Sequence, residues 1–134
     1  MPRIVTVAAA QLGAIQKADT RQAVVARMLA LMDEAKAKGA DFIVYPELAL
    51  TTFFPRWYHE DRAEADFWFE KEMPSAATRP LFERAVKHGM GMSLGYAELT
   101  PDGHHRVAAA LQHHRRAGRL DDDHLGVVDD ALPT

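Results

Sequence analysis

A glutamate follows directly after a short apolar run, in a place where its carboxylate could move protons. Glu47 stands behind Pro46, which ends the apolar run at residues 42–45. In an open sheet of parallel strands, ligands bind beyond the carboxyl ends of the strands, so we expect Glu47 at the ligand-binding edge. The nearest side chains are apolar: Leu48, Leu50, Phe53 and Phe54. They predict a partly desolvated carboxylate with raised proton affinity, which suits a general base. The alternative is a structural acid that caps the next turn or pairs with Arg56.

The loop after this glutamate carries groups that could bind a substrate. Its aromatic side chains are Phe53, Phe54, Trp57 and Tyr58. They could wall a pocket, with Arg56 available for a carboxylate group. For the phenylalanines, ordinary packing of the loop onto the sheet is the favoured alternative, because buried aromatic residues mostly serve cores. A subunit contact is also open. Phe53 and Arg56 are therefore the candidate substrate-binding residues.

Histidines gather near the end of the chain, whereas cysteine is absent from it. The histidines are His104, His105, His113, His114 and His124, and Asp121 to Asp123 lie among them. If these groups converged they would attract zinc or nickel, but the codon pattern described below offers another origin for them, and we expect no metal site and no cofactor. Without cysteine, the chain can form no disulfide and can use no thiolate as ligand or nucleophile.

The elements that must position these groups follow a strand, helix, strand order. Residues 4–10 form a β-branched and small apolar run, typical of a strand that is buried on both faces. Asp19 and Gln22 have capping-box spacing, and Gly39 is a suitable helix stop. Between them, one apolar stripe predicts a helix of about five turns. Its members are Val24, Val25, Met28, Leu31, Met32 and Ala35. With a second buried strand at residues 42–45, this order implies a right-handed βαβ unit with parallel strands.

The following residues continue the α/β pattern. Residues 61–72 mix acids with aromatic side chains and predict a partly exposed helix. Thr78 is a candidate cap for a helix that has Pro80 in its first turn and ends at Gly89. The side chains expected to face inward from this helix are Leu81, Phe82, Ala85 and Val86. Residues 90–99 return to strand character. For residues 107–116 we expect disorder or a frayed short helix.

Composition limits the classes of protein to consider. The 134 residues are 48% hydrophobic and carry a formal net charge of -3, as in an ordinary globular domain. Because neither sign of charge dominates, nothing points to a nucleic-acid or membrane partner. The first eleven residues lack the features of a signal peptide. No apolar stretch approaches the roughly 20 residues of a membrane span. We therefore expect a cytoplasmic protein.

The use of amino acids changes abruptly after Thr100. Among the first 100 residues, 33 are of types whose codons must begin with A or T (Ile, Thr, Met, Phe, Tyr, Trp, Lys and Ser), yet residues 101–133 contain none of these types. A slipped reading frame in a GC-rich gene would produce this change, because third codon bases would become first bases. Residues 110–114, read one base out of frame, permit Arg-Phe-Asn-Thr-Thr. We therefore interpret the tail as frameshifted.

Several segments before this change carry a resemblance to a known family. They are FIVYPELALTTFFPRW at residues 42–57, EMP at 72–74, RPLFE at 79–83 and GYAEL at 95–99. They resemble the nitrilase superfamily of carbon-nitrogen hydrolases, and within it the N-carbamoyl-D-amino acid amidohydrolases. The resemblance covers residues 3 to 106. The out-of-frame reading of residues 110–114 also resembles the Arg-Phe-Asn-Thr segment that such enzymes have after the Gly-Tyr-Ala-Glu strand.

The resemblance implies a catalytic set of which this chain holds one member. In the family, a cysteine thiolate attacks the amide or carbamoyl carbon, a glutamate moves the proton and a lysine stabilises the oxyanion. Glu47 corresponds to the glutamate. The family's lysine belongs to a Tyr-Arg-Lys segment further downstream, whereas the last lysine here is Lys87. The cysteine has no counterpart, so we expect the chain alone to be inactive.

The resemblance also implies the fold and the partners. We expect an α/β protein, the incomplete N-terminal part of a nitrilase-like αββα sandwich, with residues 1–106 in the hydrolase domain and 107–134 as a poorly ordered tail. Intact relatives would be homo-oligomers that hydrolyse an N-carbamoyl amino acid. The alternative is a non-catalytic half-domain that associates with family subunits or is unstable, because a sheet edge and a sheet face lack partners.

Overall fold

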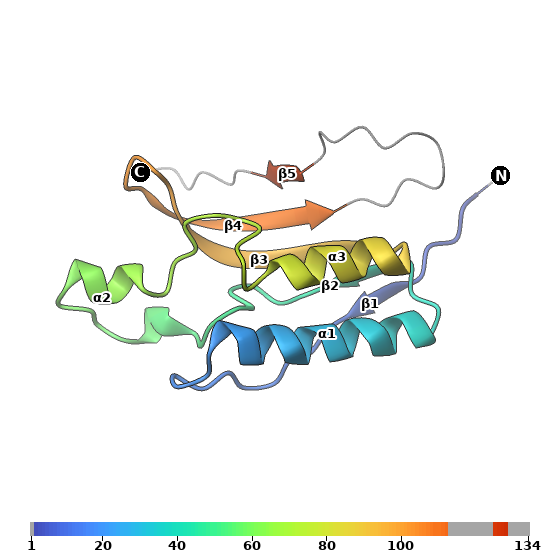
Figure 1. Ribbon diagram of the computed structural model, residues 1–134, viewed down its shortest axis with the longest axis horizontal. Coiled ribbons are helices and arrows are strands. Elements are labelled where there is room, and N and C mark those ends of the chain that lie inside the picture. The colour runs from blue at the N-terminus through green and yellow to red at the C-terminus, as the bar shows by residue number, and fades with distance from the viewer. Residues whose placement is uncertain (1, 113–124, 129–134) are drawn as a thin grey trace.

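The protein forms one twisted sheet with helices packed on one side (Figure 1). The computed structural model describes residues 2–112 and 125–128, with side chains for the first of these ranges. The elements in chain order are β1 (Val7–Ala9), α1 (Arg21–Ala37), β2 (Phe42–Val44), a 3₁₀ turn (Phe54–Arg56), α2 (Arg62–Asp66), α3 (Arg79–His88), β3 (Gly91–Leu99), β4 (His105–Gln112) and β5 (Leu125–Val128).

Strand order in the sheet follows chain order, β1-β2-β3-β4-β5. The first three strands are parallel to one another, and β3, β4 and β5 are antiparallel neighbours. This mixed α/β arrangement agrees with the expected partial nitrilase-like fold. The parallel pairing of β1 and β2 across α1 confirms the predicted strand, helix, strand unit.

Helix α1 covers the sheet with the stripe that its sequence predicted. Five residues of the stripe are buried: Val24, Val25, Met28, Met32 and Ala35. The N-terminus of α1 differs from the predicted capping box of Asp19 and Gln22. The N-cap residue is Thr20, whose hydroxyl accepts a hydrogen bond from the Ala23 N–H at 3.1 Å. Asp19 instead accepts from the Gln16 N–H within the preceding loop. The helix ends as expected, before Gly39 at φ 82°.

Helix α3 lies beside α1 on the same face of the sheet (Figure 1). Its inward side chains are Leu81, Phe82 and Ala85, and Gly89 ends it in the left-handed conformation. Val86 was expected to face inward, but it is 57% exposed. Thr78 occupies the cap position without capping the helix, since its hydroxyl accepts from the Ser75 N–H at 2.8 Å.

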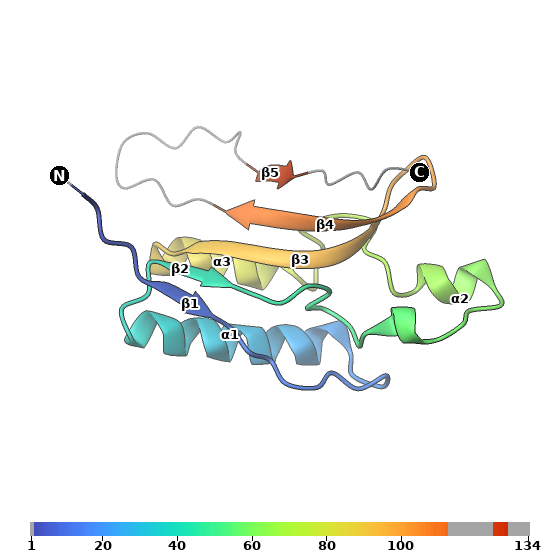
Figure 2. The ribbon, with the colours of Figure 1, turned by 180° about the vertical axis from the view of Figure 1, so that it is seen from behind.

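The opposite face of the sheet has no helix over it (Figure 2). Val7, Val44 and Val107 point to this face and are 58%, 39% and 44% exposed. The prediction that β1 and β2 are buried on both faces is therefore wrong. Continuous apolar runs are typical of strands that are packed on both faces of a sheet, but the helices of the described chain cover only one face.

The segment predicted as a helix at residues 61–72 is mostly irregular. Helix α2 is only five residues long, and the chain then runs along β3, where Glu70 forms an isolated parallel bridge with Glu98. The buried Glu70 carboxylate pairs with Arg21, which also donates to the Phe67 carbonyl at 2.7 Å. In place of the helical hydrogen bonds that we expected, the Glu70 N–H donates to the Ala97 carbonyl at 2.7 Å and the Glu70 carbonyl accepts from the Leu99 N–H at 2.9 Å.

The expectation of disorder or a frayed helix from residue 107 is wrong for residues 107–112. These residues belong to β4, which pairs with β3 from Met92↔Gln112 to Leu99↔His105. Ala108 and Ala110 are buried in the main core. The ladder forms because β3 offers an unpaired edge, which satisfies the backbone groups of β4. Residues 113–116 lie outside the described part of the chain.

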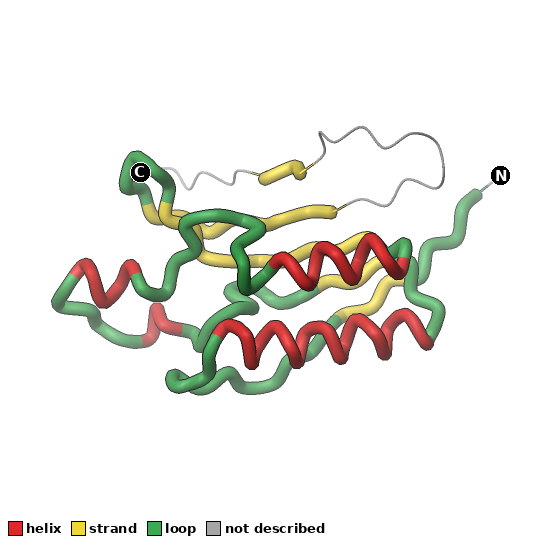
Figure 3. The backbone as a smooth tube through the Cα atoms, in the orientation of Figure 1, coloured by secondary structure: helices red, strands yellow, loops and turns green. Residues whose placement is uncertain are grey.

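The loops after β1 and β2 emerge at the same end of the sheet (Figure 3). This end carries α2 as well, whereas the turns that lead from α1 into β2 and from α3 into β3 lie at the other end. No helix within the described residues is long and apolar enough to cross a membrane.

Candidate active site

Backbone hydrogen bonds fix the position of Glu47 against β3. The Tyr45 N–H donates to the Ser93 carbonyl at 2.9 Å, and the Ala49 N–H donates to the Gly95 carbonyl at 3.0 Å. Glu47 therefore sits in a turn that continues β2 past its last paired residue. The structure places it beyond the carboxyl end of this parallel strand, where sheets of this kind bind ligands.

Gly95 allows the turn to approach β3 closely. A Cβ atom at this position would lie 3.0 Å from the Glu47 Cα and 3.1 Å from the Pro46 carbonyl oxygen. Both neighbours are backbone atoms, which cannot rotate away as a side chain could. Because Leu94 and Tyr96 point into the core, Gly95 faces the uncovered side of the sheet. Glu47 consequently lies where that face meets the ligand-binding edge.

The residue after Glu47 has an unusual backbone conformation. Leu48 has φ 49°, the only positive value for a residue other than glycine in the described part of the chain. A left-handed conformation costs a branched side chain about 1–2 kcal/mol. Burial offsets this cost, since Leu48 packs in a second cluster with Phe54, Trp68 and Ala97. Such strained residues concentrate at functional sites, which agrees with a role for the adjacent carboxylate.

The Glu47 side chain is exposed, so the expected partial desolvation is wrong for this structure. The apolar neighbours Leu48, Leu50 and Phe54 turn into the cores and leave the carboxylate uncovered. Within residues 2–112 the Glu47 side chain forms no hydrogen bond or ion pair, so the alternative of a structural pair with Arg56 has no support there. An exposed carboxylate without a partner can accept a proton from a group brought to it.

In the aromatic loop at residues 53–58, one phenylalanine is buried and the other is exposed. Phe54 is buried and stacks on Trp68, with ring centroids 6.1 Å apart and planes at 7°. Phe53, the first candidate substrate-binding residue, is 54% exposed. The second, Arg56, is exposed with its guanidinium 5.5 Å from the Trp57 ring centroid. The structure thus holds both candidates in the loop after Glu47, but it does not enclose them.

No sequence pattern indicated that a further cation, Lys17, lies at this loop. The Lys17 ammonium lies 5.1 Å from the Trp57 ring centroid, in a cation–π contact. Lys17 belongs to the loop after β1, and no spacing in the sequence connects it with Trp57. Only the emergence of the two loops at the same end brings them together.

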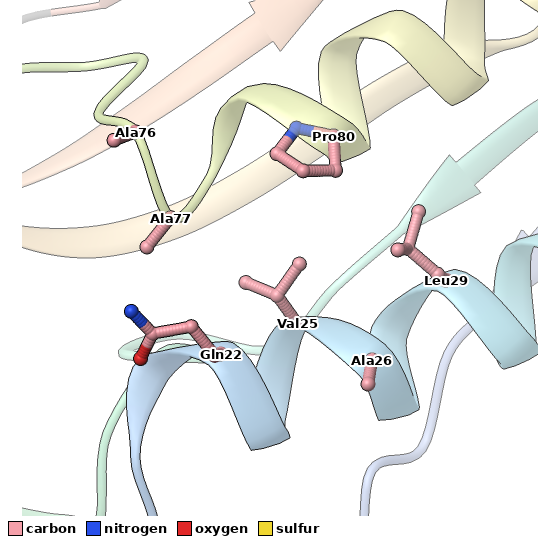
Figure 4. A pocket seen from close by; sticks show the side chains of 7 residues that line it. All are labelled: Gln22, Val25, Ala26, Leu29, Ala76, Ala77 and Pro80. Carbon is pink, nitrogen blue, oxygen red and sulfur yellow. The ribbon is translucent and has the colours of Figure 1, made fainter.

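Two hollows of the surface lie away from Glu47. A shallow apolar groove of about 280 Å³ runs between α1 and the start of α3 (Figure 4). Its walls are Gln22, Val25, Ala26 and Leu29 on one side and Ala76, Ala77 and Pro80 on the other. A second hollow of about 530 Å³ lies beside Arg21 and Glu70. Glu47 lines neither of these two hollows.

The two histidines of the predicted cluster that the structure describes are hydrogen-bonded to acids. His104 Nδ1 lies 2.8 Å from Asp102, and His105 Nε2 lies 2.6 Å from Asp66. Within the described residues no group of three potential ligands converges on a metal-sized site. The other members of the predicted cluster, from residue 113 onward, lie outside that part of the chain.

The sheet and the helices packed on it define an α/β protein, with the Glu47 carboxylate beyond the end of a parallel strand. Residues 6–122 match the family model described as carbon-nitrogen hydrolase. The chain belongs to the carbon-nitrogen hydrolase family, whose members form the nitrilase superfamily of enzymes acting on carbon-nitrogen bonds.

Solved structures share the fold with this chain. The crystal structure of an N-terminal amidase aligns with a TM-score of 0.62 at 18% identity, over 81% of this chain and 25% of the amidase. Its complex with an Asn-Glu peptide gives the same values. A glutamine-dependent NAD(+) synthetase from Cytophaga hutchinsonii aligns at 0.51 and 15% identity, over 82% of this chain and 17% of the synthetase. The chain thus spans about a quarter of the amidase and less of the synthetase.

Proposed function

We propose that this chain is the N-terminal part of a hydrolase that converts an N-carbamoyl-D-amino acid to the D-amino acid, carbon dioxide and ammonia. Family membership supports carbon-nitrogen hydrolysis, and the segments at residues 42–57 and 95–99 support the narrower substrate class. The single structural observation behind the proposal is the position of Glu47. Its carboxylate is exposed and has no partner among residues 2–112, and backbone hydrogen bonds to β3 fix the turn that carries it.

In the complete enzyme Glu47 would act as the general base. It would take the proton from a cysteine thiol supplied by a later part of the polypeptide, so that the thiolate can attack the carbamoyl carbon. A lysine from that part would stabilise the resulting oxyanion. Phe53 and Arg56 would contact the substrate from the loop after Glu47, with Arg56 pairing with its carboxylate. We further propose that the complete enzyme is a cytoplasmic homo-oligomer that needs no metal or cofactor.

The 134-residue chain is proposed to be inactive, with residues 107–134 encoded by a shifted frame. The sequence contains no cysteine and no lysine after Lys87, so two of the three groups are missing. Purified chain incubated with N-carbamoyl-D-amino acids should release no ammonia. Turnover that is abolished by Glu47→Gln would contradict this proposal, because it would require a different nucleophile.

Translation of the gene in its other frames tests the frameshift. A continuation with a Tyr-Arg-Lys segment and a later cysteine would support it, whereas its absence would favour a genuine short protein. In an enzyme with the frame restored, Glu47→Gln should lower kcat about 10²–10⁴-fold, the usual contribution of a general base. Glu83→Gln, at an exposed glutamate on α3, is the matched control and should leave kcat unchanged. Equal rates for the two variants would remove Glu47 from the mechanism.

A non-catalytic half-domain is the second candidate function. The uncovered face of the sheet favours it, because such a face requires a partner whether or not the chain carries out chemistry. The gene translation separates the candidates, since a half-domain has no continuation in another frame.

A further inference from the structure

Two cationic side chains share one tryptophan ring at the end of the sheet that carries Glu47. The Lys17 ammonium lies 5.1 Å and the Arg56 guanidinium 5.5 Å from the Trp57 ring centroid. Lys17 belongs to the loop after β1 and Arg56 to the loop after β2, and these loops emerge at the same end of the sheet (Figure 3). Because both charges lie within 5.5 Å of one ring centre, they are close enough to act together on one small anion.

Neither cation has an acidic partner among residues 2–112. Asp19 is the acid nearest to Lys17 in the chain, but it lies 3.8 Å from Arg27 and accepts a hydrogen bond from a backbone N–H of its own loop. Arg56 forms no ion pair or hydrogen bond within these residues. The indole ring attracts each cation without neutralising it, so the repulsion between the two like charges persists. An anion that contacts both cations would replace this repulsion by attraction.

The tryptophan ring is held by the same packing that holds Glu47. Trp57 is partly buried and packs against the second cluster, of which Leu48 is a member. Leu48 follows Glu47 directly and keeps the left-handed turn of the chain there. One set of buried side chains therefore anchors both the pair of cations and the proposed general base.

We infer that Lys17 is a further substrate-binding residue, which pairs together with Arg56 with the carboxylate of the N-carbamoyl amino acid. The inference rests on the proposed function, which supplies the carboxylate, and it adds the loop after β1 to the substrate site. Lys17 and Arg56 are both exposed, so solvent screens each contact. We therefore expect this part of the site alone to bind with a dissociation constant of about 1–10 mM.

Nuclear magnetic resonance of the 134-residue chain measures this binding without any turnover. The two probes are N-carbamoyl-D-alanine and its primary amide, which differ only in the carboxylate. The acid should shift the indole N–H signal of Trp57, and the amide should bind about tenfold more weakly because it loses both charged contacts. The buried indole of Trp68 is the internal reference. Added salt should weaken the binding of the acid, since the contacts are between exposed charges.

Substitution of Lys17 separates a binding role from a structural one. Lys17→Gln should weaken binding of the acid about three- to fivefold and leave binding of the amide unchanged. Lys17→Arg keeps the charge and should keep the preference for the acid. A lysine that only fastens the loop after β1 to Trp57 would affect both probes equally. The matched control is Lys36→Gln, at an exposed lysine on α1, which should leave binding of both probes unchanged.

Three results of this titration would overturn the inference. They are no shift with either probe, equal affinities for the acid and the amide, and the affinity of the unsubstituted chain in Lys17→Gln.

An enzyme with the frame restored gives an independent measurement. Lys17→Gln should raise the KM for N-carbamoyl-D-alanine about three- to fivefold with little change in kcat, because the carboxylate contact is the same in the bound substrate and in the transition state. An unchanged KM in an active enzyme would overturn the inference and leave the proposed hydrolysis standing. Binding of the acid over the amide, together with a restored enzyme that has no turnover, would support the carboxylate site and overturn the proposed hydrolysis.

Discussion

The Cα atom of Glu47 lies 3.0 Å from the place where a Cβ atom on Gly95 would stand. Glu47 lies in the turn after β2 and Gly95 lies in β3, and their close approach requires glycine at position 95. The position of the proposed general base is thus set by the lack of a side chain 48 positions further along the chain.

Gly95→Ala should destabilise the protein and displace the turn at Glu47. The new methyl group meets the Glu47 Cα and the Pro46 carbonyl oxygen, and overpacking against backbone typically costs about 1–3 kcal/mol. Urea unfolding measures the loss. Ser93→Ala, on the same strand and face, adds no atoms and serves as the control. A Gly95→Ala protein as stable as the control would show that the turn moves freely.

Leu48→Gly should be more stable than Leu48→Ala, although glycine is normally the more destabilising of the two residues. Both variants lose the buried leucine side chain, at a cost of about 2–5 kcal/mol. Only glycine adopts φ 49° without strain, which favours it by about 1 kcal/mol.

The order of the two unfolding midpoints checks this expectation. At Leu50, a buried neighbour for which no left-handed conformation is found, the same pair of substitutions should give the normal order, with alanine the more stable. The normal order at Leu48 as well would contradict a left-handed backbone there.

Alkaline pH should destabilise the fold through its buried tyrosines. Burial, together with the nearby Glu98 carboxylate, raises the pKa of Tyr96 to about 12 from its ordinary value of 10. Burial also raises the pKa of Tyr45, whose hydroxyl donates to the Met28 carbonyl at 2.7 Å. Between pH 10 and 12 the unfolded chain loses these protons first, so stability present below pH 10 is lost as the pH rises.

For Tyr96 alone the loss by pH 12 amounts to about 2–3 kcal/mol. Urea midpoints between pH 8 and 11 measure its onset, and Tyr96→Phe should flatten the dependence. An unchanged slope in Tyr96→Phe would assign the alkaline loss to other groups.

Asp33 should contribute a small, acid-sensitive link between α1 and α3. Its carboxylate accepts hydrogen bonds from Arg84 at 2.6 Å and from His88 at 2.7 Å. The hydrogen bond from Arg84, then that from His88, holds the pKa of Asp33 below its ordinary value of 3.8. This stability is present above that value and is lost as the pH falls through the lowered pKa of the folded state.

Because the Asp33 side chain is about half exposed, Asp33→Asn should cost only about 0.2–1 kcal/mol at neutral pH and nothing in strong acid. A double-mutant cycle with Arg84→Gln isolates the link. A coupling energy of zero at neutral pH would show that solvent screens the pair completely.

The sequence by itself determined the local elements. The apolar stripe from Val24 to Ala35 predicted α1, Gly39 and Gly89 marked helix ends, and the apolar runs identified the parallel strands. These features depend on side chains a few residues apart, whose periodicity the sequence displays. The position of Glu47 after β2 followed in the same way, because a strand end is a local feature.

Tertiary structure decided which surfaces are covered. The exposure of Val44 and of the Glu47 carboxylate depends on what packs over them, and nothing in the described chain does. Residues 107–112 became a strand because β3 offered an unpaired edge, and Glu70 joined β3 through backbone hydrogen bonds with Ala97 and Leu99. The close approach of the Glu47 turn to Gly95 is likewise a tertiary contact. Contacts between segments that are distant in the chain produce no periodic pattern in the sequence, so the sequence did not reveal them.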